Sequence, residues 1–218
     1  MREIAADLYL LGGKPRNFFN IYLMGDVLVD SGTRYAARRI LREVGKAPPS
    51  ALALTHGHAD HQGSAHEVCT TLGIPLLCGA ADRSAVESGD IRSLLPPHWS
   101  SAVSTKLWAG PGHPVEQVLR DGDEIGGFRV IDTPGHSPGH ISFFRDEDRV
   151  LILGDVVFGL NLVTGRPGLR LPPDLFTPDP EMNRNSARAV AALEPSLVCF
   201  GHGRPVGTEE FVSFVETL

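Results

Sequence analysis

Cysteine is scarce in this chain of 218 residues, which contains only Cys69, Cys78 and Cys199. The three are scattered, odd in number and without the CxxC spacing of common metal sites. We interpret them as buried thiols that pack in the core of a protein from a reducing compartment.

Positive charge is also in short supply. Twenty Lys and Arg residues stand against 26 Asp and Glu residues, which leaves a formal net charge of −6. Broad, charge-driven binding to nucleic acid requires a basic face. We therefore expect no nucleic-acid partner, although a local basic pocket is not excluded.

Long apolar runs are missing as well. The longest, VLILGDVVFGL from Val150, is interrupted by Asp155 and is well short of the roughly 20 residues that span a bilayer. The N-terminal segment MREIAADLYLLGG has charges between its apolar residues and does not resemble a signal peptide. We expect a cytoplasmic protein without a membrane partner.

The rest of the composition is typical of globular proteins. Hydrophobic residues make up 42% and charged residues 21% of the chain, which argues against disordered, collagen-like and coiled-coil classes. A chain of this length can bury a core without disulfides, and no low-complexity linker divides it. We expect one domain over residues 1–218.

Short apolar runs alternate with segments of helical periodicity along the chain. The expected strands are 4–10, 18–24, 26–30, 51–54, 75–77, 115–119, 127–132, 140–145, 149–153 and 197–200. The expected helices are 35–44, 62–72, 180–193 with Asp179 as N-cap, and one that Thr208 caps. This mixture predicts an α/β (α+β) fold, a four-layer αββα sandwich of two mixed β-sheets with helices outside.

The segment 89–114 differs from its surroundings because its Pro, Gly and Trp residues show no clear periodicity. Long irregular loops in compact domains are usually functional or mobile. We interpret this segment as an insertion or lid.

Four apolar runs are each followed by a small or turn residue and then by a His or Asp, side chains that can bind metal ions. These side chains are His56 after ALAL, His136 after RVID, Asp155 after VLIL and His202 after LVCF. Buried strands place the residues that follow them at one edge of the sheets, where ligand sites of layered folds gather. The pattern predicts that four strand ends converge on one site.

The first of these motifs, THGHADH at residues 55–61, is the richest in donors. In an extended segment His56, His58 and Asp60 point to one side, and two imidazoles so placed can reach one ion at a Zn–N distance of about 2.0 to 2.1 Å. A turn at His61 would direct His61 and Asp60 to a second ion. A lone HxH more often marks solvated or core histidines, but the other motifs repeat the pattern.

Taken in order, THGHADH, DTPGHSPGH, LGD and FGHG resemble the ligand motifs of the metallo-β-lactamase superfamily, and NFFNIYLMGDVLVDSG resembles its opening hairpin. The resemblance covers nearly the whole chain and agrees with the αββα fold. It implies one metal ion at His56, His58 and His136, a second ion at Asp60, His61 and His202, and a bridge at Asp155.

Nitrogen and oxygen donors suit two divalent ions, with zinc favoured and iron or manganese as alternatives. The implied chemistry is a hydroxide, bridging the two ions, that attacks an ester-type carbonyl in a thioester, lactone or other small ester. Asp60, which orients the hydroxide, and Asp155 are the catalytic carboxylates in this hypothesis. No Ser or Cys nucleophile is assigned, and the expected partner is a small-molecule substrate.

Four better-known branches of the family fit less well. The commonest β-lactamase subclass has Cys where this chain has Asp155. Glyoxalase II enzymes carry a C-terminal extension, which we do not expect here because the chain ends at Leu218. RNA-processing nucleases need a large inserted domain. Quorum-quenching lactonases use a Tyr downstream of the bridging Asp, whereas the three tyrosines here are upstream.

An alternative of a different class remains. Persulfide dioxygenases resemble this fold but hold one iron with two His and one Asp, which would be His56, His136 and Asp155 here, in the manner of non-haem iron oxygenases. A non-catalytic binding module is less attractive because no ligand position is missing. The sequence also leaves open whether the protein is a homodimer.

Substrate selectivity is expected to come from the segment after Asp155 and from residues 89–114. Arg166 and Arg170 are candidates for a clamp on a substrate carboxylate or phosphate, with a solvated loop as the alternative. The candidates for an apolar pocket are Phe158, Leu160, Leu162, Trp99 and Trp108. The remaining histidines are expected outside the ligand set: His140 as a hydrogen-bond partner, His66 on a helix surface, and His98 and His113 in solvent.

Overall fold

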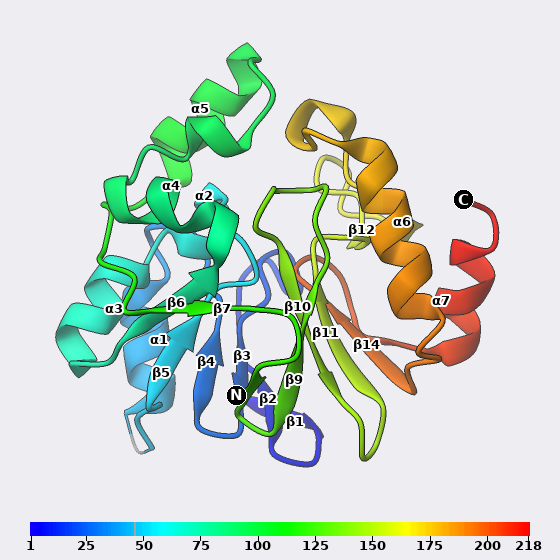
Figure 1. Ribbon diagram of the computed structural model, residues 1–218. Coiled ribbons are helices and arrows are strands. Elements are labelled where there is room, and N and C mark those ends of the chain that lie inside the picture. Colours follow the sequence, from blue (N-terminus) through cyan, green and yellow to red (C-terminus); the bar gives the residue numbers. More distant parts are fainter. Residues whose placement is uncertain (46) are drawn as a thin grey trace.

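Two β-sheets pack face to face in the computed structural model, which describes residues 1–45 and 47–218, the side chains of Trp99 and Ser100 excepted. The first sheet has the order β1-β2-β3-β4-β5-β6-β7 and the second the order β15-β14-β11-β10-β9-β8. Helices cover the outer face of each sheet (Figure 1). The predicted four-layer αββα sandwich is confirmed.

The first sheet begins with antiparallel hairpins and continues with parallel strands. Its strands are β1 (Arg2–Ala5), β2 (Leu8–Leu10), β3 (Tyr22–Met24), β4 (Val27–Val29), β5 (Ala51–Ala53), β6 (Leu76–Gly79) and β7 (Gln117–Leu119). The pairs β4–β5, β5–β6 and β6–β7 are parallel. The sheet is therefore mixed, as predicted.

The second sheet is antiparallel except for the parallel pair β11–β14. Its strands are β8 (Glu124–Ile125), β9 (Phe128–Asp132), β10 (Ile141–Arg145), β11 (Val150–Gly154), β14 (Leu197–Phe200) and β15 (Val206–Gly207). A separate hairpin of β12 (Phe158–Leu160) and β13 (Pro167–Arg170), absent from the sequence prediction, follows β11.

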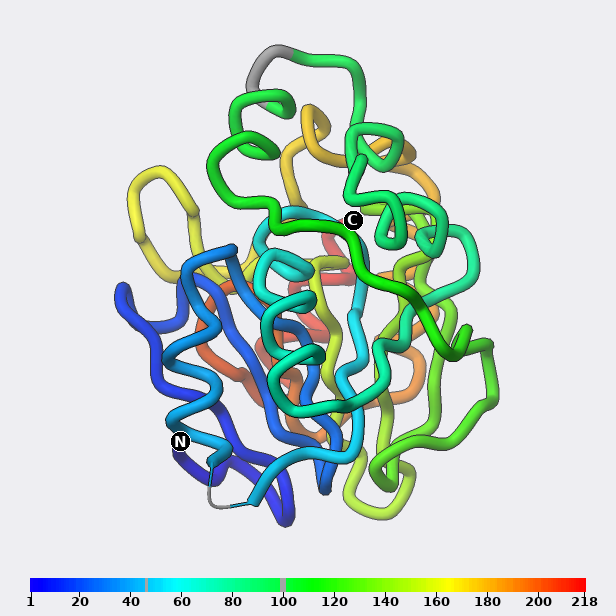
Figure 2. The backbone as a smooth tube through the Cα atoms, turned by 90° about the vertical axis from the view of Figure 1, so that its left-hand side faces the viewer, coloured from blue at the N-terminus to red at the C-terminus, as the bar shows by residue number. Residues whose placement is uncertain are grey.

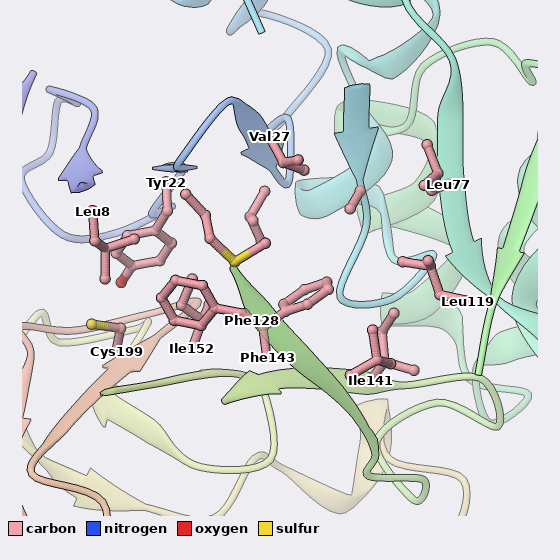
Figure 3. Packing of buried hydrophobic residues seen from close by; sticks show 14 of the residues in the cluster. Leu8, Tyr22, Val27, Leu77, Leu119, Phe128, Ile141, Phe143, Ile152 and Cys199 are labelled. Carbon is pink, nitrogen blue, oxygen red and sulfur yellow. The ribbon is translucent and has the colours of Figure 1, made fainter. Parts of the chain in front are cut away.

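Alternating side chains of each strand divide between two cores. In β3, Tyr22 and Met24 join the cluster between the sheets, whereas Leu23 joins the cluster beneath the helices. Figure 3 shows the inter-sheet core, where Leu77 of the first sheet and Phe143 of the second are among the side chains that meet. Period-two alternation with both faces buried is what a central layer of a sandwich requires.

The outer layers are two pairs of helices. Helices α1 (Ala37–Val44) and α3 (Ala65–Leu72) cover the first sheet, and α6 (Pro180–Ala191) and α7 (Thr208–Val215) cover the second. Figure 2 shows α1 and α3 from the side, in front of the first sheet. No helix that the structure describes is long and apolar enough to cross a bilayer.

Several short helices lie near one end of the sandwich (Figure 1). They are α2 (Ala59–Gln62), η1 (Ala80–Asp82), α4 (Arg83–Ser88), η2 (Ile91–Leu94), α5 (Trp99–Trp108) and η3 (Asp174–Phe176). The segment 89–114 was predicted to be irregular, but it contains η2 and α5. Whether it acts as a lid stays a prediction.

Three other predicted elements need correction. The strand 4–10 is two strands, because Asp7 at φ +49° makes a turn between β1 and β2. The helix 62–72 begins at Ala65, since Gly63 separates it from α2. Helix α7 has Gly207 rather than Thr208 as its N-cap, and the Thr208 hydroxyl donates to the Pro195 carbonyl instead.

Two other local predictions are confirmed. The Asp179 carboxylate caps α6 by accepting a hydrogen bond from the Met182 N–H at 2.9 Å. All three cysteines are buried and free. Burial raises the pKa of the Cys69 and Cys78 thiols to about 12, so they behave as apolar packing groups at neutral pH.

Candidate metal centre

Seven predicted side chains come together at the end of the sandwich where four strands stop. His56 and His58 follow β5 directly, and Asp60 and His61 lie on α2. The other three follow the second sheet's strands: His136 lies between β9 and β10, Asp155 follows β11 and His202 follows β14. Parallel pairing of β11 with β14 brings the last two to the same edge.

The bend predicted at His61 occurs earlier in the chain. His58 is the N-cap of α2 and is still extended, and the helix begins at Ala59. Asp60 and His61 therefore belong to one short helical turn rather than to the extended segment of His56 and His58. This change of direction separates the donors of the THGHADH motif into two sets.

The donor atoms form two separate triads and a third group between them. In each group, one atom per residue lies within 4.8 Å of the others. The groups are His56, His58 and His136; Asp60, His61 and His202; and His56, His61 and Asp155. Each of the two separate triads combines side chains from both sheets, so the centre lies across the inter-sheet boundary.

Asp155 lies between the two triads. Its Oδ2 is 3.5 Å from Nε2 of His136 and 4.0 Å from Nε2 of His56 on one side. On the other side it is 3.0 Å from Nε2 of His202 and 3.3 Å from Nε2 of His61. One carboxylate oxygen is thus central to four imidazoles.

Hydrogen bonds on the outer side of the rings set the orientation of His61 and His56. The Nδ1–H of His61 donates to the Asp30 carboxylate at 2.8 Å. The Thr55 hydroxyl donates to Asp30 at 2.9 Å, so it accepts from Nδ1–H of His56 at 3.1 Å. In the neutral form of each ring Nε2 is then the unprotonated nitrogen, and it belongs to the donor group.

His58 and His136 are held in the same way and face each other. The Nε2–H of His58 donates to the Leu94 carbonyl at 3.3 Å, and Nδ1–H of His136 donates to the Thr177 hydroxyl at 3.2 Å. Their other nitrogens, His58 Nδ1 and His136 Nε2, are 3.0 Å apart. In these tautomers both facing nitrogens are unprotonated, and a cation that both ligate would offset their mutual repulsion.

His202 is held by the N-terminal part of the chain. Its Nδ1–H donates to the Phe18 carbonyl. The Asn20 side-chain amide donates to the carbonyls of Phe200 and Gly203 at 2.8 and 2.7 Å, which ties down the loop on both sides of His202. Sequence reasoning missed this contact because Asn20 is 180 residues from Phe200.

Several buried polar atoms of the centre have no hydrogen-bond partner among the described residues. They are Nε2 of His56, His61 and His202, and Oδ1 of Asp155. Buried polar atoms are almost always satisfied, because leaving one unpaired costs about 1–3 kcal/mol. Unpartnered imidazole nitrogens and a carboxylate oxygen that converge fit the ligand preferences of divalent transition metals.

Charge in the centre favours bound cations. Burial alone would raise the pKa of Asp60, but His61 and His202 outweigh it and hold the pKa at about 2. Burial, together with His136, lowers the pKa of His58 to about 3. Burial opposes a proton on His202 as well, yet Asp155 and Asp60 raise its pKa to about 10. The carboxylates therefore stay ionised and attract positive charge.

Gly201 and Gly154 allow the close approach of the two strand ends. A Cβ at Gly201 would collide with Asp155 Oδ1 and would lie 2.7 Å from Cε1 of His61. Gly154 has φ +64°, and a Cβ there would lie 2.7 Å from Nε2 of His140. Only glycine fits before Asp155 and His202 without displacing the donors.

His140 holds the backbone beneath Asp155, consistent with its predicted role as a hydrogen-bond partner. Its Nε2 accepts from the Asp155 N–H at 3.0 Å, and its Nδ1–H donates to the Thr133 hydroxyl at 2.8 Å. Thr133 in turn contacts the Ser142 hydroxyl, which donates to the Leu153 carbonyl. Both ring nitrogens are therefore engaged outside the donor groups.

Asp82 is a fully buried carboxylate that sequence reasoning missed. It accepts hydrogen bonds from the Gly57 N–H at 2.8 Å, the Gly139 N–H at 2.7 Å and the Ser137 hydroxyl at 2.7 Å. It thus joins the loop of His56 and His58 to the loop of His136. Burial raises the pKa of Asp82, and the three hydrogen bonds oppose that rise. No local pattern near residue 82 reveals this role.

A cavity opens beside the donors. Its lining consists of His58, Ala59, Asp60, Leu95, Ser104, Trp108, His136, Asp155, Phe158, Leu162, Phe176 and His202. Of the predicted pocket residues, Phe158, Leu162 and Trp108 line it, Leu160 does not, and the Trp99 side chain lies outside the described residues. Leu95 and Phe176 were not predicted.

The predicted arginine clamp is not part of this lining. Arg166 is exposed and Arg170 is half-buried, and neither is among the residues around the cavity. Their role as a clamp stays a prediction. His98 is exposed, as predicted. His66 and His113 are instead paired, with their Nδ1 atoms 3.2 Å apart, and neither lines the cavity.

Comparison with known proteins agrees with this geometry. The family model of the metallo-beta-lactamase superfamily matches residues 18–202, so the chain belongs to that superfamily. It is 33% identical to a Bacillus subtilis (strain 168) protein named probable metallo-hydrolase YflN, over 88% of this chain and 80% of that protein. The resemblance drawn from the motifs is confirmed.

Two solved structures extend the comparison. The BLEG-1 B3 metallo-β-lactamase is 26% identical and has a TM-score of 0.70, with 94% of this chain and 96% of that chain covered. TTHA1623, solved in a di-iron-bound form, is 27% identical with a TM-score of 0.64, with coverage of 93% and 89%. The protein is a hydrolase of this superfamily, and its fold implies divalent metal ions.

Proposed function

We propose that the protein is a dinuclear metallohydrolase that cleaves an ester-type bond in a small molecule, such as a thioester or a lactone. The observation that carries this proposal is the pair of donor triads with Asp155 between them, beside one cavity. Two ions about 3.5 to 4 Å apart are the arrangement of two-metal hydrolases.

Each triad would hold one divalent ion. The first ion would be held by His56, His58 and His136, and the second by Asp60, His61 and His202. Asp155 would contribute to both sites. Nitrogen and oxygen donors favour zinc under this proposal, while the di-iron form of TTHA1623 supports iron as an alternative. When bound, such ions lower the pKa of water and polarise a carbonyl.

The chain's own groups have defined tasks in this reaction. Asp60 lines the cavity with its side chain 14% exposed, so its carboxylate can accept a hydrogen bond from the attacking water and orient that water. Asp30, Thr55 and Thr177 keep the imidazoles in one tautomer. Ser104 is the only hydroxyl side chain in the described lining, and its hydroxyl donates to the Ser101 carbonyl at 3.0 Å rather than to a basic side chain.

Mononuclear iron chemistry of the persulfide dioxygenase type is the second candidate. It rests on His56, His136 and Asp155, whose donor atoms lie together: the Asp155 Oδ2 is 4.0 Å and 3.5 Å from the two Nε2 atoms. The complete second triad favours the hydrolase.

Metal analysis tests the proposal directly. Protein purified without added metal is expected to contain two zinc ions per chain and to hydrolyse members of a panel of thioesters, lactones and phosphoesters. One iron per chain, with oxygen consumption on a persulfide substrate and no hydrolysis, would overturn it. The same panel should include a β-lactam, because the BLEG-1 relative is a β-lactamase by name.

A further inference from the structure

Five large apolar side chains of the cavity lining form what we call the apolar wall. It consists of Leu95 after η2, Trp108 of α5, Phe158 of β12, Leu162 of the β12–β13 hairpin and Phe176 of η3. These residues come from separate segments of the chain. Their convergence on one cavity is a property of the fold rather than of one local apolar run.

This apolar wall reaches the candidate metal ligands without a polar gap. The Phe158 ring packs edge-on against His202, with ring centres 4.7 Å apart, and against His136 at 5.9 Å. Phe19 packs against both Trp108 and His202, at 5.6 Å in each case. A group that occupies the cavity beside the donors therefore meets hydrocarbon and ring edges.

The lining offers nothing to neutralise an anionic group away from the metal. No Lys or Arg is present among the described residues that form it, and its only polar side-chain groups outside the donor set are the Ser104 hydroxyl and the Trp108 indole N–H, both uncharged. Burying a charge without a partner is strongly unfavourable. The part of the substrate that lies here must be uncharged.

Two of the wall-forming elements carry further exposed apolar side chains. On α5, Val103 is 46% and Leu107 50% exposed, and on η3 Leu175 is 39% exposed. Apolar surface beside a cavity commonly marks a ligand-binding region. Apolar contact can therefore extend beyond the cavity to the surface of the same elements.

We propose that the substrate carries an uncharged aliphatic chain next to its scissile carbonyl, and that this chain packs against Leu95, Trp108, Phe158, Leu162 and Phe176. The inference rests on the proposed ester hydrolysis and adds the substrate class. It assigns Leu162 and Phe176 as specificity-determining residues, because both line the cavity and neither is in a donor group.

A homologous substrate series tests this class. Straight-chain acyl esters from acetyl to decanoyl, with one common leaving group, are compared with the same chains ending in a carboxylate. We expect kcat/KM to rise by up to about fourfold per methylene until the wall is covered, and the terminal carboxylate to lower it at least tenfold. A flat profile or a preference for the carboxylate series would overturn the inference.

Variants locate the effect on the wall. Leu162→Ala and Phe176→Ala should each lower the ratio of decanoyl to acetyl kcat/KM by about tenfold, and Leu162→Arg should reduce the discrimination against the carboxylate series. Val163→Ala is the matched control, since Val163 is the next residue, is 95% exposed and does not line the cavity. Unchanged ratios in both alanine variants would contradict the assignment.

The ratio also protects the test from folding defects, because a partly folded sample lowers the rates for both substrates equally. Failure of the two proposals can be told apart. If the metal-replete protein hydrolyses no ester of either series, the proposed hydrolysis fails and the chain preference fails with it. If it hydrolyses all of them at similar rates, only the chain preference is wrong.

Discussion

The two walls of the cavity are built in different ways. On the donor side, every imidazole ring is fixed by an outer hydrogen bond and lies on a short helix or in a loop that follows a strand. In the apolar wall, the residues come from the end of η2, from α5, from η3 and from a two-stranded hairpin that belongs to neither large sheet. The sandwich positions the candidate metal ligands, whereas the peripheral elements determine which substrate groups the cavity accepts.

This division has a physical basis. Donors must be held within about 0.5 Å of a working geometry, which rigid elements and a supporting hydrogen-bond shell provide. Hydrophobic contact is non-directional and depends mainly on buried area, so loops and short helices suffice for the other wall. Changes on the donor side should therefore abolish function, and changes on the apolar side should redirect it.

Asp155→Ala should have the largest effect. It removes the carboxylate between the triads, so we expect metal content to fall and kcat/KM to drop more than about 100-fold, above the range for loss of a supporting contact. Metal quantification and turnover of the same sample measure both. Asp146→Ala, at an exposed carboxylate paired with Arg129, is the control. A fully metallated Asp155 variant with native activity would contradict the assignment.

Asp82→Asn tests the support behind the donors. The amide keeps the size of the side chain but turns an NH₂ group toward donors that Asp82 now accepts from, and we expect metal affinity and kcat/KM to fall about 10- to 100-fold. Unfolding should become easier by about 1–3 kcal/mol. Asp90→Asn, at an exposed carboxylate nearby, should change neither. Native metal affinity in Asp82→Asn would show that the two loops hold their geometry unaided.

Chelation tests the centre as a link between the sheets. Each of the two separate triads takes donors from both sheets, so bound cations should stabilise the fold by about 3 kcal/mol at a free concentration 100 times Kd. EDTA should lower Tm, and added zinc should restore it. The stabilisation should weaken as the pH falls, because protons compete with the ions for the imidazoles and, despite burial, Asp155 and Asp60 raise the pKa of His202 to about 10.

Asp155→Ala gives the control for this measurement, since its Tm should respond less to EDTA. Equal responses in the two proteins would place the stabilising ion elsewhere.

Arg166→Ala should have the smallest effect. Because Arg166 is exposed and outside the cavity lining, we expect kcat/KM for neutral esters to change less than about twofold, a size typical of surface substitutions. Arg170→Ala serves as the parallel variant. A KM raised for anionic esters alone would support the arginine clamp and count against an uncharged substrate.

The fold was predictable where sequence periodicity reflects burial. Strand β11 is buried along its whole length, and α6 begins with its predicted Asp179 cap. Helix α5 was missed because Val103 and Leu107 are exposed on it. A helix without a continuous buried stripe has no helical period for a sequence pattern to reveal.

The donors were predictable because each follows a local strand pattern, and the structure brings all seven together. The residues that support them were not. Asp82, Thr177 and Asn20 contact segments 25 to 183 residues away in sequence, and a buried Asp or Thr has no distinctive local pattern. Three of the five residues of the apolar wall were predicted, and the other two, Leu95 and Phe176, lie at the ends of the short 3-10 helices η2 and η3, which have no sequence period.

The donors of the two triads are synthesised at different times, because they lie at different positions along the chain. The first triad is complete once His136 has been made, whereas the second must wait for His202, which follows β14 near the C-terminus. Proteins are synthesised from the N-terminus, and folding can begin before the chain is finished. A nascent chain can therefore carry all donors of the first triad while the second still lacks His202, which lies between β14 and β15.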